Sequence, residues 1–189
     1  MGKTFFLSLL AFGATIFSAR GDIIPDLSPN PPASAVGGFT WNYATNVTVN
    51  QSVQHGDFFT IYDFGSIAPG SNTQPTGWTF SQALIGPTAA LTSPTANPSI
   101  LNLTWTYNGA SPIVGSAALG IFSVITSTDQ LKAGQFTAEA TRNSGPNAGT
   151  KVSNIGAVSV PVPEPSALLP ILGVCAAAVF SRLLRRQHA

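Results

Sequence analysis

The sequence predicts an all-β protein, an antiparallel β-sandwich of the Ig-like or jelly-roll kind, and three observations lead to this prediction. Charged residues make up only 8% of the 189 residues, while Gly, Pro, Ser, Thr and Asn are abundant. This composition favours short strands and turns over helices. Short runs alternate apolar and polar residues, and groups of Pro, Gly and Asn separate them. The spacing indicates seven or eight strands.

The N-terminal residues 1–21 have the pattern of a secretory signal peptide. Lys3 precedes an apolar run over 5–17, and small residues follow it. A basic start, an apolar centre and a small-residue exit are the three parts of such a peptide. We therefore expect a signal helix that is cleaved during export, most simply before Asp22.

The mature chain is expected to begin with a leader and continue into one domain. Residues 22–35 read DIIPDLSPNPPASA, a proline-rich segment without periodicity, so we expect it to run along the surface. Residues 36–160 form the sandwich domain. The expected strands lie, in chain order, in FTWNYATNVTVNQSV, FFTIYDF, TGWTFSQALIG, LNLTWTY, ALGIFSVITS, GQFTAEATRN and KVSNIGAVSV.

Aromatic side chains are expected to supply the core of this domain. The candidates are Trp41, Phe59, Tyr62, Trp78, Phe80, Trp105, Tyr107, Phe122 and Phe136. The single cysteine, Cys175, excludes an intrachain disulfide. An exported domain of this kind must depend on core burial and strand pairing.

The charge of the body argues against a nucleic-acid partner. Between Asp22 and Pro165 lie seven acidic residues and three basic ones, a formal charge of −4. Binding to nucleic acid needs a basic patch that neutralises phosphates.

Candidate catalytic groups are few. His55 is in the turn sequence HGD, where a solvated turn residue is the favoured interpretation over a general base. Asp57 and Asp63 would face one side of an unbulged strand and could form a carboxylate pair for glycoside hydrolysis. Nothing in the sequence places supporting groups around them, so a turn acid and a strand-end acid is the favoured interpretation. We expect no enzyme, with a hydrolase as the remote alternative.

Metal and cofactor sites are not expected. The sequence has no Cys/His set for zinc and no loop of closely spaced oxygen ligands for calcium, and Asp129 and Glu139 stand apart. No glycine-rich phosphate loop follows an expected strand.

Exposed aromatic rings could stack on sugars, and Trp41, Trp78 and Trp105 are the candidates. Each alternates with polar neighbours as a core residue does, so burial is the favoured interpretation for each. Glycosylation sequons begin at Asn46, Asn50 and Asn102.

The C-terminal residues 161–189 are predicted to hold a transmembrane helix over about 167–184. Prolines keep the preceding chain extended. The apolar run 167–180 has fourteen residues, about 21 Å as a helix against a hydrocarbon core of about 30 Å. Arginines after it can extend the span by reaching the headgroups, and they should stay cytoplasmic.

The order of a Pro163-Glu164-Pro165 motif, a short hydrophobic helix and an arginine cluster resembles the PEP-CTERM sorting signal of Gram-negative bacteria. The resemblance implies that Pro163, Glu164 and Pro165 are recognised by exosortase, a membrane transpeptidase-like enzyme. It implies that Arg182, Arg185 and Arg186 act as the stop. Stretches such as TIYDFG and NLTWTY are also similar to small secreted PEP-CTERM proteins. A permanent, unprocessed anchor is the alternative.

Together these features predict an exported structural or interaction protein of the cell envelope or extracellular matrix. The resemblance implies an inner-membrane intermediate, then the cell surface or matrix. The expected partners are an exosortase-type enzyme, the membrane through the C-terminal helix, and extracellular polysaccharide. The alternative function is a carbohydrate-binding module of the polysaccharide matrix.

Overall fold

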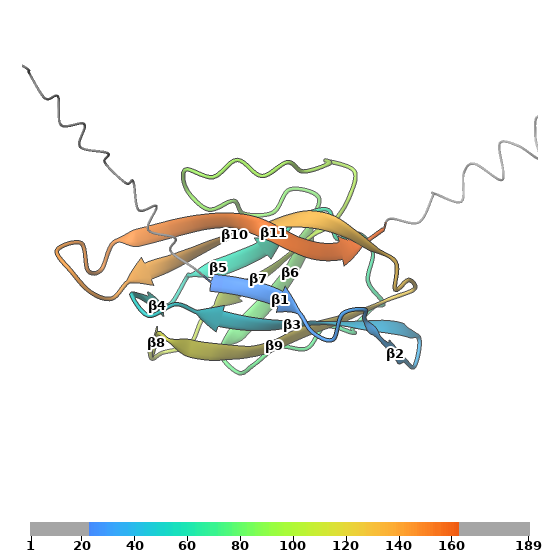
Figure 1. Cartoon of the computed structure of the whole chain (residues 1–189), viewed down its shortest axis with the longest axis horizontal. Helices are drawn as coiled ribbons and strands as arrows, with labels where there is room; N and C mark the ends of the chain where they lie inside the picture. The colour runs from blue at the N-terminus through green and yellow to red at the C-terminus, as the bar shows by residue number, and fades with distance from the viewer. Residues whose placement is uncertain (1–22, 163–189) are drawn as a thin grey trace, which may run out of the picture.

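The computed structural model of the chain describes residues 23–162, which form eleven β-strands (Figure 1). The strands are β1 (Ile23–Leu27), β2 (Ala33–Ala35), β3 (Gly38–Val47), β4 (Gln51–Val53), β5 (Phe58–Ile61), β6 (Trp78–Ala83), β7 (Asn102–Tyr107), β8 (Ile113–Val114), β9 (Ala117–Thr126), β10 (Leu131–Arg142) and β11 (Lys151–Pro161). Within 23–162 no helix is long and apolar enough to cross a membrane. The expected signal helix and transmembrane helix fall outside the described residues.

The smaller sheet is built around β3. Strand β9 pairs antiparallel along one edge of β3. Strands β1 and β2 pair with the other edge, one after the other along its length. The ladder between β3 and β9 shifts register between Thr45 and Asn46, next to Gly120. A register shift of this kind bends and twists a strand locally.

The larger sheet is centred on the long hairpin of β10 and β11. These two strands pair antiparallel from Leu131 opposite Pro161 to Thr141 opposite Lys151. The other edge of β10 pairs with β5 and, further along, with β4. Strands β7 and β6 continue the sheet beyond β5, and β8 pairs with β4. All these pairings are antiparallel, so the all-β class and antiparallel sheets expected from the sequence are confirmed for residues 23–162.

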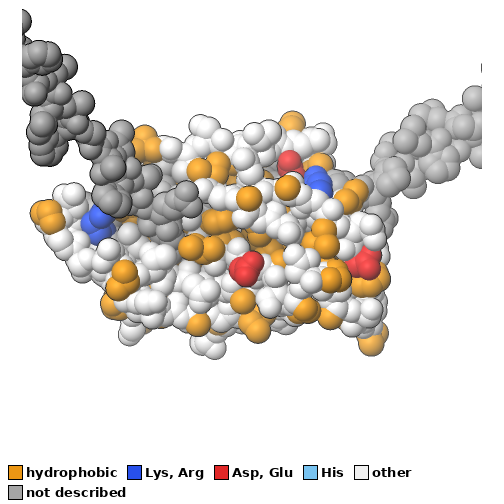
Figure 2. All heavy atoms as spheres, in the orientation of Figure 1, with side chains coloured by type: hydrophobic (Ala, Val, Ile, Leu, Met, Phe, Trp, Pro, Cys, Tyr) orange, Lys and Arg blue, Asp and Glu red, His pale blue; other side chains and the backbone are white. Residues whose placement is uncertain are grey.

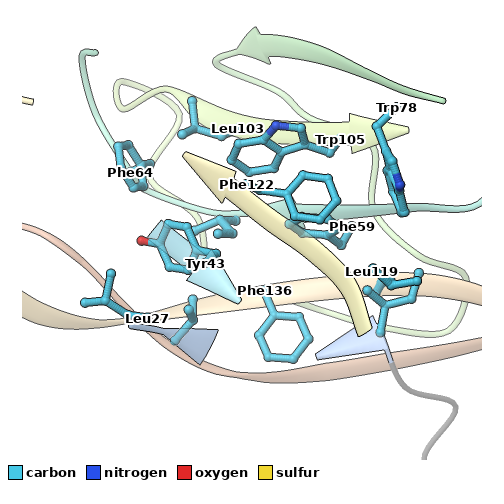
Figure 3. Close-up of a cluster of buried hydrophobic side chains, with 14 of the residues drawn as sticks. Leu27, Tyr43, Phe59, Phe64, Trp78, Leu103, Trp105, Leu119, Phe122 and Phe136 are labelled. Atoms are coloured by element: carbon cyan, nitrogen blue, oxygen red, sulfur yellow. The ribbon is translucent and has the colours of Figure 1, made fainter. Parts of the chain in front are cut away.

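The hydrophobic core lies between the two sheets (Figures 1 and 3). Alternation along the strands directs one set of side chains inward from each sheet. Strand β7, for example, buries Leu103, Trp105 and Tyr107 in this core. Of the nine aromatic residues predicted for the core, eight are buried, and Phe80 is half-buried against them.

Phe122 on β9 joins the two sheets through aromatic contacts (Figure 3). Its ring centroid lies 5.0 Å from that of Phe59, 4.9 Å from that of Trp78 and 5.7 Å from that of Trp105, with steep interplanar angles. Edge-to-face contacts of this kind add to the free energy gained by burying the rings.

The expected proline-rich leader 22–35 is corrected by the structure, because most of it belongs to the smaller sheet. Strand β1 buries Ile23 and Leu27 and exposes the residues between them in alternation. Pro25 is tolerated because β1 is an edge strand, where a missing N–H breaks no ladder on the solvent side. Strand β1 is therefore part of the sandwich and not a leader.

Candidate functional site

The three tryptophans proposed for sugar stacking are all in the core. Their exposed fractions are 0% for Trp41 and Trp105 and 4% for Trp78. The three tyrosines are buried as well. Stacking on a sugar needs a ring face open to solvent, and none of these six residues presents one. The structure thus removes the feature on which the carbohydrate-binding alternative depended.

His55 is an exposed turn residue, as the turn interpretation expected. It lies between Val53 and Phe58, and the turn is closed by a hydrogen bond of 2.9 Å from Asp57 N to Gln54 O. Gly56 takes a positive φ of 89° at the third position of this turn, which favours glycine.

Asp57 and Asp63 stand before and after β5 and have separate partners. The Asp63 carboxylate accepts a hydrogen bond of 2.7 Å from Asn97 N. The Asp63 N–H donates to Asn102 Oδ1 at 2.9 Å. Asn102 is itself buried, and its Nδ2 donates to Leu84 O, so its sequon is inaccessible. Asp63 thus holds together loops at one end of β5, and Asp57 makes its contacts at the other end.

A cleft of about 640 Å³ opens at the end of the domain where the chain leaves the fold. The loops that follow β5, β6 and β9, the segment before β7 and the end of β11 form its walls. The lining residues are Phe64, Gly65, Ser66, Leu84, Ser99, Ile100, Leu101, Thr126, Ser127, Thr128, Pro161 and Val162. Apolar side chains and hydroxyl groups thus share a cavity large enough for a small ligand.

Hydrogen bonds hold one wall of this cleft in place from the core. The Trp41 indole N–H donates to Thr126 Oγ1 at 2.8 Å and lies 3.1 Å from Thr128 O. Among the other lining residues, Gly65 N donates to Leu101 O at 3.0 Å. These hydrogen bonds fix the positions of lining residues that are distant in the sequence.

A long loop, residues 84–101, covers the outer face of the larger sheet and runs along the upper side of Figure 1. Buried polar side chains of the sheet hold it. The Tyr62 hydroxyl lies 3.0 Å from Pro87 O, 2.8 Å from Thr88 Oγ1 and 3.0 Å from Thr137 Oγ1. Thr60 Oγ1 also donates to Pro87 O at 2.8 Å. Because the loop covers them, Thr60 and Thr137 are fully buried although they lie on the outer face of the sheet.

We expect Tyr62→Phe to loosen this loop without unfolding the domain. The change leaves buried acceptors without their partner, which costs about 1–3 kcal/mol. Amide hydrogen exchange over 84–101 should accelerate, while exchange in β3 and β9 stays the same. Tyr107→Phe is the matched control, because its hydroxyl donates to Ser111 O instead. Equal acceleration in both variants would contradict the assigned role of Tyr62.

A cluster of charged and hydroxyl groups surrounds Asp57 at the other end of β10 and β11. The Asp57 side chain is completely buried, and Lys151 Nζ contacts its Oδ1 directly. Its Oδ2 accepts hydrogen bonds from Gln54 N at 2.7 Å and from Thr141 Oγ1 at 3.1 Å. Glu139 Oε1 lies 3.9 Å from Lys151 Nζ. The sequence alone does not indicate this cluster, because Lys151 is 94 residues from Asp57 and only strand pairing brings them together.

Among residues 23–162 no three His, Cys, Asp or Glu side chains come together as a metal site.

Comparison with protein-family models, curated proteins and solved structures finds no match. On the face shown in Figure 2, lysine and arginine side chains are few and scattered over a mostly uncharged surface. The sorting residues Pro163, Glu164, Pro165, Arg182, Arg185 and Arg186 fall outside the described residues.

Proposed function

We propose that this chain is an exported structural or interaction protein of a Gram-negative cell envelope or extracellular matrix, sorted through its C-terminal PEP-CTERM-like segment. An exosortase-type enzyme is the proposed processing partner. The folded body is the part that remains outside, as an antiparallel sandwich of Ig-like or jelly-roll type. The chain would pass through an inner-membrane intermediate before release or attachment.

The observation that carries this proposal is the position of the end of β11 in the sequence. Strand β11 closes at Pro161, and Val162 N makes a hydrogen bond of 2.8 Å to Gln130 O. The Pro163-Glu164-Pro165 motif begins at the very next residue. Its placement supports presentation of the motif to an enzyme at the edge of a folded body, because alternate prolines disfavour helix in the residues that precede them.

The proposal predicts that Glu164→Ala blocks C-terminal processing. In a host that carries exosortase, signal-peptide cleavage should proceed normally, while protein with its full tail persists in the membrane fraction. Removal of Arg182, Arg185 and Arg186 should also prevent processing, because the tail then loses its cytoplasmic stop. Intact mass of the recovered protein reports both cleavages.

Asp129→Ala is the matched control, since it removes another loop acid near the same end of the domain. It should be processed like the wild type. If the wild-type protein keeps its tail indefinitely and the Glu164 variant behaves identically, the segment is a plain anchor and the sorting proposal fails.

A further inference from the structure

We propose that Lys151 and Asp57 join through an intramolecular isopeptide bond, with Glu139 carrying the proton. Lys151 begins β11, Asp57 precedes β5, and Glu139 lies on β10 between these two strands. The sheet thus brings an amine, the carboxyl group that it would attack and a second carboxylate into one cluster. No step of the proposed sorting function uses these residues.

The amine already contacts the carboxyl group that it would attack. Lys151 Nζ contacts Oδ1 of Asp57, the oxygen bonded to the carbon at which the new bond would form. The lysine side chain is half-exposed, but the carboxylate that its Nζ reaches is completely buried. Holding two reactants in contact is worth an effective concentration of about 10⁵–10⁸ M in well-oriented systems. Proximity of this kind can drive a condensation that free amines and carboxylates in water do not undergo.

The other oxygen of Asp57 lies where negative charge would develop. Attack on Cγ gives a tetrahedral intermediate whose Oδ2 becomes an oxyanion. Gln54 N–H and the Thr141 hydroxyl both donate to Oδ2, at 2.7 Å and 3.1 Å. Donors fixed in advance at an oxyanion are among the strongest contributions to acyl-transfer catalysis. Gln54 N–H and the Thr141 hydroxyl would therefore stabilise the oxyanion in this step.

The reaction balances without any oxidant or co-reactant. The Lys151 ammonium gives one proton to Glu139, and Glu139 passes it to Oδ1 of Asp57. The free amine then attacks Cγ of the neutral acid to form the C–N bond, and the second proton lost from Nζ goes to Oδ1. The Cγ–Oδ1 bond breaks and one water molecule leaves. The product is a neutral amide, and Glu139 ends as it began.

Burial favours the product over the ion pair. Burying a carboxylate costs hydration free energy, and attraction to its charged partner offsets that cost only in part. The amide removes both charges from this site and keeps a carbonyl oxygen for the Gln54 and Thr141 donors. The bond would also supply the covalent link that a chain with a single cysteine cannot obtain from a disulfide.

The test is peptide mass spectrometry of the full chain, purified after export, denatured and digested with trypsin. We expect the peptide containing Lys151 to be joined to the peptide containing Asp57, with a combined mass lower by one water molecule. We also expect no cleavage after Lys151. Lys151→Arg should abolish the branched peptide, and Lys132→Arg, the control at the other lysine of β10 and β11, should retain it.

Glu139→Gln tests the proton carrier separately from folding. The amide keeps the size and place of the side chain but cannot accept the proton, so the branched peptide should form at least tenfold more slowly in freshly refolded protein. A rate equal to that of the wild type would remove Glu139 from the mechanism. Complete cleavage after Lys151 in the wild-type protein, with no loss of water, would overturn the bond and leave an ion pair.

Discussion

Phe122→Ala is expected to lower the free energy of unfolding by about 3–5 kcal/mol, the usual cost of emptying a large aromatic site in a core. Phe122 is completely buried and contacts the rings of Phe59, Trp78 and Trp105. The indole N–H groups of Trp78 and Trp105 have no hydrogen-bond partner in the described part of the chain. Packing alone therefore holds these two rings, and the cavity should let them reorient.

Urea unfolding followed by tryptophan fluorescence measures this loss, and near-ultraviolet circular dichroism reports the loosened rings. Ile121→Ala is the matched control, because it removes a neighbouring apolar side chain that is 57% exposed. Its effect should stay within about 0.5 kcal/mol. Equal losses from the two variants would mean that the two sheets do not meet through Phe122.

Gly38→Ala is expected to destabilise the domain by about 2–6 kcal/mol, from backbone strain and from a collision. Gly38 has a φ of 145°, a backbone conformation that residues other than glycine rarely adopt. A Cβ at this position would also meet the backbone carbonyl of Thr126 on β9. Backbone cannot move aside as the end of a side chain can, so β3 and β9 would have to separate there.

The adjacent Gly37 provides the control, because it isolates the strain from the collision. Its φ is 87°, but a Cβ there meets no atom within 4 Å. Gly37→Ala should therefore cost only about 1–2 kcal/mol. Urea unfolding of both variants gives the comparison. If the two losses agree, the close approach of Gly38 to Thr126 is not needed for stability.

The sequence contained enough information to find the longer strands but not the short strands β2 and β8 or the proline-containing strand β1. Alternation located β3, β5, β6, β7 and the three long strands that follow β8, because each directs side chains into the core. Strand β1 is not evident from the sequence, because Pro25 interrupts it and proline is typical of irregular chain. Counting that proline as apolar would have shown the alternation of Ile23, Pro25 and Leu27.

The candidate sites were less accessible to sequence reasoning than the strands. A core position for the tryptophans was the favoured interpretation, since burial follows from local alternation. The partners of Asp57 could not be found this way, because they depend on the register of β10 with β11 and on the position of the turn before β5. The cleft likewise joins loops that are distant in the sequence.

The direction in which β11 runs determines how the domain would carry a mechanical load. Strand β11 lies along the long axis in Figure 1, and the described chain continues from its end at Pro161 to Val162. Tension applied at Val162 along this axis is therefore parallel to the strand. It shears the β10–β11 ladder as a whole instead of unzipping one hydrogen bond at a time. A tether attached at Val162 thus meets the fold in its mechanically resistant direction.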